Sequence, residues 1–532
     1  MKKFKKIAAL ILSLAMVLAL VACGGGSSSK PASTPDSSKP ASTPDASTPA
    51  DSDPVDTNLI VGVMDDTDGF DPINTVNFVG CNLVYEGLFD IDPETSEIVG
   101  VLAESWSYDD DTHLRVKLYD NATFSNGESV TGEDVYWSWY RNISENGKEA
   151  SSFAFVDWDN WEFVSDKEFV ISYAEAFGPA VNYMTMSAFS VIDKSAMENA
   201  TSDDYWSAPV GSGPYTVKEN VSGAYSSYVR NENYWNAATM PEATSITVKN
   251  YSDAAAMFID FETGAIDMAF GLDETDAKRI NDGSVANAQL VTISTNNVIG
   301  LALPEYTASL DDVRVRQALA YAMDVNALTE IGYGILGQVA TTMIPGNIQY
   351  SLETGVQEYN PEKAKQLLAD AGVSGLTLEM VIVGAPTNER LATAMQAYLA
   401  AVGVDLQIIS CDLATAISHF KASETDVVLN SGANVTMDTF ESLQMTLETS
   451  SNATIRITDP AYNAGVMEAK LSSDNAVREK GYTAAQQWLA ENYRQIPICE
   501  PLFAFCFNTE KVAGLSTMCD EALSLRYVTF VG

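Results

Sequence analysis

The chain has 532 residues, of which 46% are hydrophobic, and its formal net charge at pH 7 is −42. This charge argues against nucleic acid as a partner, because binding phosphates requires a basic surface. The sequence holds two histidines, His113 and His419, so we expect neither a histidine-built metal site nor a Ser-His-Asp relay. We therefore do not expect an enzyme, and we expect no metal and no cofactor.

The first residues predict export and lipid attachment. Residues 2–6 include four lysines, residues 7–20 form an apolar run, and Leu20-Val21-Ala22 precede Cys23. This order is that of a signal peptide, and the apolar run is too short to span a bilayer. The Leu-x-Ala-Cys pattern resembles the lipobox of bacterial lipoproteins, which implies a lipid on Cys23 and an anchor on the outer face of the cell membrane. The alternative is an ordinary cleaved signal in which the cysteine occurs by chance.

The segment after Cys23 is predicted to be a disordered linker. Residues 24–57 consist almost wholly of Gly, Ser, Pro, Thr, Ala and Asp, with no aromatic residue, and residues 28–36 are repeated at 37–45. Such a composition cannot form a core. We interpret the segment as a spacer that holds a globular body away from the membrane.

The body from residue 58 onward is predicted to be a mixed α/β structure. Helices that end at glycine and are followed by strands recur along it, which is typical of open sheets with helices packed on their faces. The predicted elements are a strand at 245–250, a helix at 253–263, a strand at 265–270, helices at 312–323, 361–371 and 389–402, and strands at 404–410 and 496–507.

Cysteine and histidine positions suggest no chemistry. The five cysteines after Cys23 show no zinc spacing. Cys499 and Cys506 lie seven residues apart in a predicted strand, on opposite faces, so we do not expect them to bridge each other. We expect His113, in a predicted strand, and His419, in a predicted helix, to be surface or packing residues.

A series of short motifs resembles the extracytoplasmic solute-binding proteins of family 5, which are the peptide and nickel receptors of ABC transporters. The motifs occur in the order of that family and extend over nearly the whole body. They are FDP at 70–72, YEGLF at 85–89, LAESW at 102–106, FSNG at 124–127, TGEDV at 131–135, PVGSGPY at 209–215, NENYW at 231–235, the helix at 313–323 and YNPEKA at 359–364.

The resemblance implies a two-lobed periplasmic-binding-protein-like fold (type II, cluster C) with an extra domain inserted in lobe one. It also implies a monomer that captures an oligopeptide or a related small solute in the cleft between the lobes and delivers it to an ABC permease. The implied divisions are 1–22 for the signal peptide, 23–57 for the linker, 58–84, 207–295 and 497–532 for lobe one, 85–206 for the inserted domain, and 296–496 for lobe two.

Ligand contacts are expected in two loops. The loop at 75–80 offers Thr75, Asn77 and Phe78, and the loop at 429–440 offers Ser431, Asn434 and Asp438. Peptide receptors of the family carry a tryptophan and an amine-binding aspartate in the second loop, and the alignment places Ser431 and Asn434 there. The usual amine anchor is therefore missing, unless a shift of four residues gives this role to Asp438.

Two other ligand classes remain open. The arginine that binds the peptide carboxylate in dipeptide receptors has no counterpart at 381–385. A neutral oligosaccharide would use aromatic faces, for which Phe153, Phe155, Trp158 and Trp161 are available, although packing of the inserted domain explains them more simply. A peptide-sensing receptor would share the same fold.

Overall fold

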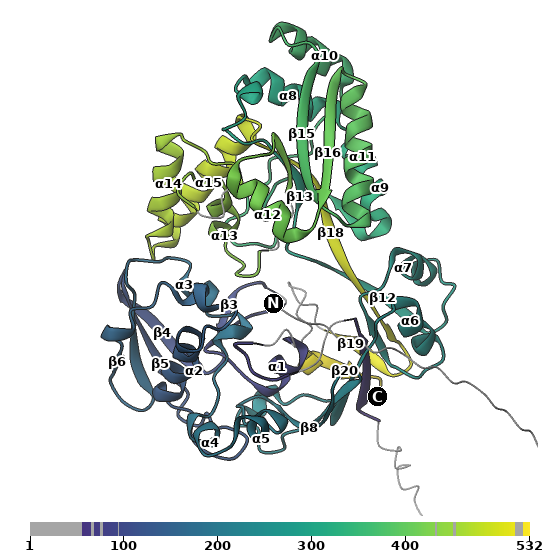
Figure 1. Cartoon of the computed structure of the whole chain (residues 1–532). Helices are drawn as coiled ribbons and strands as arrows, with labels where there is room; N and C mark the ends of the chain where they lie inside the picture. The colour runs from purple at the N-terminus through teal and green to yellow at the C-terminus, as the bar shows by residue number, and fades with distance from the viewer. Residues whose placement is uncertain are drawn as a thin grey trace, which may run out of the picture. The chain divides into compact units, whose positions relative to one another are not determined.

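A computed structural model describes residues 56–64, 69–74, 78–93, 95–430, 434–450, 454–515 and 525–532 (Figure 1). All of them belong to one compact unit, Val55–Gly532. The predicted signal peptide, Cys23 and nearly all of the predicted linker lie outside the described residues, as do Thr75, Asn77 and Ser431.

A long mixed sheet organises the described part of the chain, in which it has twelve strands. Ten of them follow in the order β16-β15-β17-β13-β18-β11-β1-β10-β9-β8, and β12 and β14 pair with β18. Their bounds are β1 (Asn58–Val63), β8 (Tyr215–Val221), β9 (Tyr225–Arg230), β10 (Ser245–Asn250), β11 (Met268–Phe270), β12 (Ala288–Ser294), β13 (Ile299–Ala302), β14 (Gly337–Val339), β15 (Leu376–Val383), β16 (Val404–Cys411), β17 (Val427–Asn430) and β18 (Gln495–Asn508).

Strand β18 runs through both halves of this sheet. Its first part, up to Pro501, pairs antiparallel with β13 and β14, and its second part, from Leu502, pairs antiparallel with β11 and β12. In Figure 1 it is the long yellow strand. The extended segment predicted at 496–507 therefore corresponds to a single strand of 14 residues.

Helices cover both halves of the sheet. In the half around β1, α6 (Ala254–Glu262) and α7 (Glu274–Asn281) follow β10 and β11, so the predicted β-α-β unit is confirmed. In the half around β15, parallel pairing of β15 with β16 and β17 is combined with α8 (Val313–Ala322), α9 (Val325–Tyr333), α10 (Pro361–Asp370) and α11 (Pro386–Ala400). Leu319, Leu391 and Leu406 are buried in the core between them.

Local signals explain the helix boundaries. Asn360 caps α10 by accepting a hydrogen bond from the amide of Lys363, and Pro361 is the first helical residue, where its missing N–H costs nothing. Helix α11 begins at Pro386, three residues before the predicted start at residue 389. The prediction missed this start because Ala385, at the N-cap, provides no side-chain acceptor.

The segment between α1 (Phe78–Val84) and β8 contains a smaller sheet and several short helices. Within the described residues its strands follow the order β4-β5-β7-β6, beside the hairpin of β2 and β3. The bounds are β2 (Phe89–Ile91), β3 (Ile98–Gly100), β4 (Ala103–Asp110), β5 (His113–Leu118), β6 (Glu162–Phe163), β7 (Glu168–Ser172), α2 (Gly132–Ser144), α3 (Ala180–Tyr183), α4 (Lys194–Glu198) and α5 (Ser202–Ser207).

Aromatic side chains fill the core of this segment. Phe153, Phe155 and Trp161 are buried there, and Trp158 packs against the same core while partly exposed. The prediction that these residues pack a core is confirmed. The core also includes residues of α13 (Thr439–Leu443), α14 (Pro460–Lys470) and α15 (Asn475–Glu491), with Phe177 and Phe440 meeting edge to face at 6.1 Å.

Polar contacts connect the same two parts of the chain. The Gly178 amide donates to the Lys470 carbonyl at 2.7 Å, and the Lys470 ammonium lies 2.8 Å from a carboxylate oxygen of Glu175. Ser473 donates to Asp111 from both its amide and its hydroxyl. Segments separated by almost 300 residues therefore share both an apolar core and a polar seam.

The described cysteines are thiols rather than disulfides. Cys81, Cys411, Cys499 and Cys506 are all unpaired, as expected for the last two. His113 lies in β5 and contacts Asp110 at 2.8 Å on the surface, while His419 lies in α12 (Leu413–Ala422). Both agree with the prediction of surface or packing roles.

Candidate ligand-binding site

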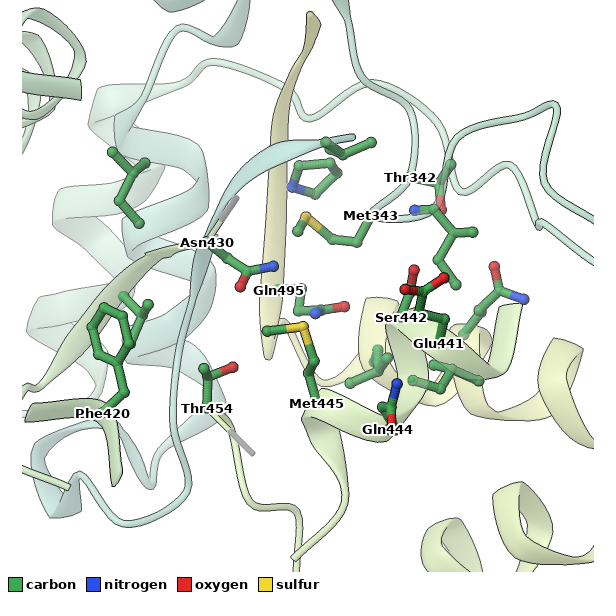
Figure 2. A pocket seen from close by; sticks show the side chains of 18 of the residues that line it. Thr342, Met343, Phe420, Asn430, Glu441, Ser442, Gln444, Met445, Thr454 and Gln495 are labelled. Carbon is green, nitrogen blue, oxygen red and sulfur yellow. The ribbon is translucent and has the colours of Figure 1, made fainter. Parts of the chain in front are cut away.

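A cavity of about 700 Å³ lies between the sheet half around β15 and helices α12, α13 and α15. Strands β15, β17 and β18 supply one side, the segment at 342–344 supplies another, and the helices contribute most of the remaining lining residues. Figure 2 labels ten of the residues that line this space: Thr342, Met343, Phe420, Asn430, Glu441, Ser442, Gln444, Met445, Thr454 and Gln495.

The lining combines apolar side chains with uncharged hydrogen-bonding groups. Met343 and Met445 reach into the middle of the space, close to the amides of Asn430 and Gln495 (Figure 2). Methionine side chains adapt to ligands of irregular shape, and an amide can both donate and accept hydrogen bonds. Such a lining suits a ligand that carries amide or hydroxyl groups on an apolar framework.

Glu441 supplies a negative charge at one side of the cavity, beside Ser442 (Figure 2). Its Oε2 accepts two hydrogen bonds of 2.8 Å from the amide and the hydroxyl of Thr436. Burial raises the pKa of the Glu441 carboxyl, and the bonds from Thr436 oppose this effect. The carboxylate is therefore held in one orientation in a region that is poor in water.

Asn434 organises the loop that leads to Glu441. The side chain is buried, and its amide nitrogen donates to the Asp438 carbonyl at 2.7 Å and to the Ser442 hydroxyl at 3.1 Å. Its backbone amide donates to the Asn296 carbonyl at 2.8 Å. Asn434 therefore contacts a residue of the cavity wall, Ser442, and its own amide is occupied by the protein.

Asp438 is fully buried and forms an ion pair with Arg478 of α15. It also caps α13 by accepting a hydrogen bond of 2.8 Å from the amide of Phe440. Burial raises the pKa of Asp438, and the guanidinium of Arg478 opposes the rise. The charge of Asp438 is thus balanced inside the protein.

The two predicted loops are described to different extents. Of the first loop, Phe78 begins α1, but its side chain, like Thr75 and Asn77, lies outside the described residues. Of the second, Asn434 and Asp438 are placed as above, and Leu429 and Asn430 line the cavity. Sequence reasoning missed Glu441 and Ser442, which directly follow that loop, and the lining residues of α12 and α15, which are distant in sequence.

Comparison with known proteins identifies the family. Residues 97–454 match the bacterial extracellular solute-binding proteins, family 5, middle region. The chain belongs to this family. Family 5 proteins are the substrate-binding receptors of ABC importers and are not enzymes. The family resemblance seen in the sequence and the expectation that the protein is not an enzyme are both confirmed.

Individual relatives of this family 5 protein have different ligands in their names. The nickel-binding periplasmic protein of Escherichia coli K12 is 27% identical over 353 residues, which span 62% of this chain and 66% of that protein. The dipeptide-binding protein of the same organism is 25% identical over 378 residues, spanning 65% and 69%. The chain thus aligns with about two thirds of the length of these relatives.

A solved structure confirms the predicted fold class. HbpA2 from Haemophilus parasuis superimposes with a TM-score of 0.81 at 22% identity, covering 89% of this chain and the whole of that chain. Among the described residues of the family 5 protein, no group of three or more His, Cys, Asp or Glu side chains is arranged to hold a metal ion. None of the described helices has the length and apolar character that crossing a bilayer requires.

Proposed function

We propose that this family 5 receptor is anchored to the outer face of the cell membrane through Cys23, binds an oligopeptide or a related small solute as a monomer, and delivers it to an ABC permease. The cavity beside β17 is proposed as the lobe-two part of the ligand site in the cleft between the lobes, because its lining residues, from Val298 to Pro497, fall almost wholly in the implied lobe two. Its volume of about 700 Å³ lies within the range of about 300–1,000 Å³ typical of small-molecule sites.

The observation that supports a peptide is the grouping of amide side chains around methionines. Asn430 and Gln495 come from two separate strands, β17 and β18, and each places an amide with a donor and an acceptor on the cavity. A peptide backbone presents the same two groups at every residue. Met343 and Met445 then provide adaptable apolar contacts for its side chains.

The loops predicted to bind the ligand belong to this proposal. Asn434 positions Ser442 at the cavity wall, while Thr75, Asn77, Phe78 and Ser431 are proposed as further contacts. The division at about residues 295 and 496 into two lobes is proposed with them. In support, the pairing of β18 changes from β14 to β12 between Pro501 and Leu502, close to the second of these divisions.

The first test is mass spectrometry of small molecules released by denaturing the purified protein, because a closed receptor often retains its ligand. We expect peptides. Recovery of a sugar or another neutral compound would replace the peptide assignment with the neutral-solute alternative. Deletion of the gene separates uptake from sensing. Import of the recovered compound would fall if the protein is an uptake receptor and would stay unchanged if it is a sensing receptor.

A blocking variant tests the location of the site. Met445→Trp places a larger side chain in the middle of the cavity and should abolish retention of the released compounds. Val356→Trp is the matched control, because Val356 is exposed and lies outside the cavity lining. Equal retention by both variants would show that the ligand binds elsewhere.

The lipid anchor has its own test. Growth with a radiolabelled or alkyne-tagged fatty acid should label the wild-type protein and leave Cys23→Ser unlabelled. The Cys23→Ser protein should then appear in the medium or the soluble extracytoplasmic fraction. Labelling of both proteins, or of neither, would contradict the anchor.

A further inference from the structure

We propose that Glu441 is the counter-ion for a cationic group of the ligand, and that it makes the receptor selective for solutes bearing an ammonium or guanidinium group. This inference rests on the proposed function, since it takes the cavity beside β17 as the ligand site. The amine anchor of related peptide receptors aligns with Asn434, which is uncharged. The inference instead gives the specificity role to Glu441, seven positions later.

The geometry gives Glu441 the position of a binding group. It comes from α13, and its side chain lies on the cavity wall beside Ser442 (Figure 2). The two hydrogen bonds from Thr436 both fall on Oε2 and fix the orientation of the carboxylate. A carboxylate has about four acceptor sites, so the two bonds from Thr436 and a further one from the Val435 backbone leave room for a donor of a ligand.

The distribution of charge around Glu441 is unbalanced. The neighbouring carboxylate, Asp438, is paired with Arg478 and does not line the cavity. Among the described lining residues, the charged side chains are Glu441 on α13 and Lys421 on α12. Lys421 follows Phe420, which lies across the space from Glu441 in Figure 2. Glu441 is only partly exposed, and a partly buried carboxylate without a cation is unfavourable, so a ligand cation placed beside it would bind strongly.

The position of the charge explains how an amine can be bound although Asn434 is uncharged. Asn434 faces Asp438 and Ser442, which leaves its amide engaged within the loop. Glu441 lies on the cavity side of the same loop and carries the charge that Asn434 lacks. The cation can belong to the N-terminus of a peptide or to a lysine or arginine side chain, and the two sources are separable by chemistry.

The test is competitive retention by the full purified receptor. The probe is an equimolar pool of synthetic tri- to pentapeptides, with and without Lys and Arg, each present in free and N-acetylated form, together with glucosamine and N-acetylglucosamine. Retained compounds are quantified by mass spectrometry for the wild type, Glu441→Gln and Met445→Trp. Glu468→Gln is the matched control, because it removes the same charge from an exposed position on α14 outside the cavity.

We expect the wild type to enrich cationic compounds over their neutral counterparts by at least about tenfold, and Glu441→Gln to lose that preference while it still retains neutral ones. Preference for free over acetylated N-termini identifies the peptide amine as the cation, and preference for Lys or Arg in acetylated peptides identifies a side chain. A purely structural role for Glu441 would lower retention of all compounds equally.

Three outcomes overturn the inference. If Glu441→Gln keeps the selectivity of the wild type, Glu441 has no role in recognition. This holds even if Met445→Trp loses all retention, a result that would support the cavity as the site. Equal retention of cationic and neutral compounds by the wild type would likewise show that Glu441 does not select for cationic ligands. Failure of the wild type to retain any cationic compound would overturn the charge preference, and failure to retain any peptide would separately overturn the peptide assignment.

Discussion

Tyr234 donates a hydrogen bond of 2.5 Å to Glu86, although 148 residues separate the two in sequence. Trp235 donates its indole N–H to the other carboxylate oxygen of Glu86 at 2.8 Å, and the guanidinium of Arg526 lies 3.9 Å away. The motifs YEGLF and NENYW therefore meet at one buried carboxylate. Their shared role is structural, because Glu86 satisfies two donors and balances a buried cation.

Glu86→Gln should destabilise the protein by about 2 kcal/mol at pH 7, because the amide N–H of the glutamine faces one of the two donors and leaves that donor without an acceptor. Urea unfolding followed by circular dichroism measures the change. Glu97→Gln, at an exposed position, should stay within about 0.5 kcal/mol of the wild type. A loss no larger than that of the control would contradict a central role for Glu86.

The effect of Glu86→Gln should depend on pH in a defined direction. Burial raises the pKa of Glu86 above its ordinary value of 4.5 in the folded protein. The folded state therefore holds the Glu86 proton more tightly than the unfolded state does, and the contribution of this group is largest below pH 4.5. It decreases as the pH rises through the raised pKa. The stability difference between wild type and Glu86→Gln should be greater at pH 4 than at pH 7, and a difference that grows with pH would refute this sign.

Asn434→Ala should weaken ligand binding by more than tenfold. The variant loses the bonds to the Asp438 carbonyl and the Ser442 hydroxyl, so the cavity wall would no longer be fixed in its binding geometry. Isothermal titration with the compound recovered from the wild type measures the effect. Unchanged affinity would remove Asn434 from the site, whatever the variant does to stability.

Gly178→Ala should destabilise the seam between residue 178 and α14. A Cβ atom on Gly178 would lie 2.1 Å from the Ser472 carbonyl oxygen, closer than any contact allows. Relief of the clash requires the backbone to move and costs about 1–3 kcal/mol. Gly346→Ala is the control, because no atom lies within 4 Å of the added methyl position. Equal melting temperatures for the two variants would show that the seam contributes little.

The four described thiols should differ in reactivity. Cys411 is partly exposed, whereas Cys81, Cys499 and Cys506 are buried, and burial raises the pKa of Cys499 to about 12. Since the thiolate is the reactive form, iodoacetamide at pH 8 should modify Cys411 first by at least about tenfold. Peptide mapping of the labelled protein gives the order, and prior labelling of Cys499 would contradict the described burial.

Many helices and strands can be predicted from the sequence because their boundaries are set by neighbouring residues. Pro361 and Gly372 predict the helix at 361–371, and the structure has α10 at Pro361–Asp370. The strand at 404–410 and the extended segment at 496–507 were predicted from apolar composition and were found within one residue at each end.

The residues that line the binding cavity are harder to predict from the sequence, because tertiary contacts bring them together. The pairing of Asp438 with Arg478 joins residues 40 positions apart, and no spacing rule connects them. Of the loop at 429–440, Leu429 and Asn430 line the cavity, and the ligand contacts expected in this loop stay a prediction. The direction of the Asn434 side chain and the approach of α12 and α15 depend on packing that local sequence does not encode.

The change of partner along β18 has a mechanical consequence. It falls between Pro501 and Leu502, and proline has no N–H to donate to a ladder. The φ angle of Pro501 is fixed by its ring, and its carbonyl accepts hydrogen bonds from the amide and the hydroxyl of Thr295. Turning one half of the sheet against the other would therefore have to break these bonds or move the residues on either side of Pro501. Ligand binding that turns one half against the other should leave amide exchange slow at Phe503–Phe507.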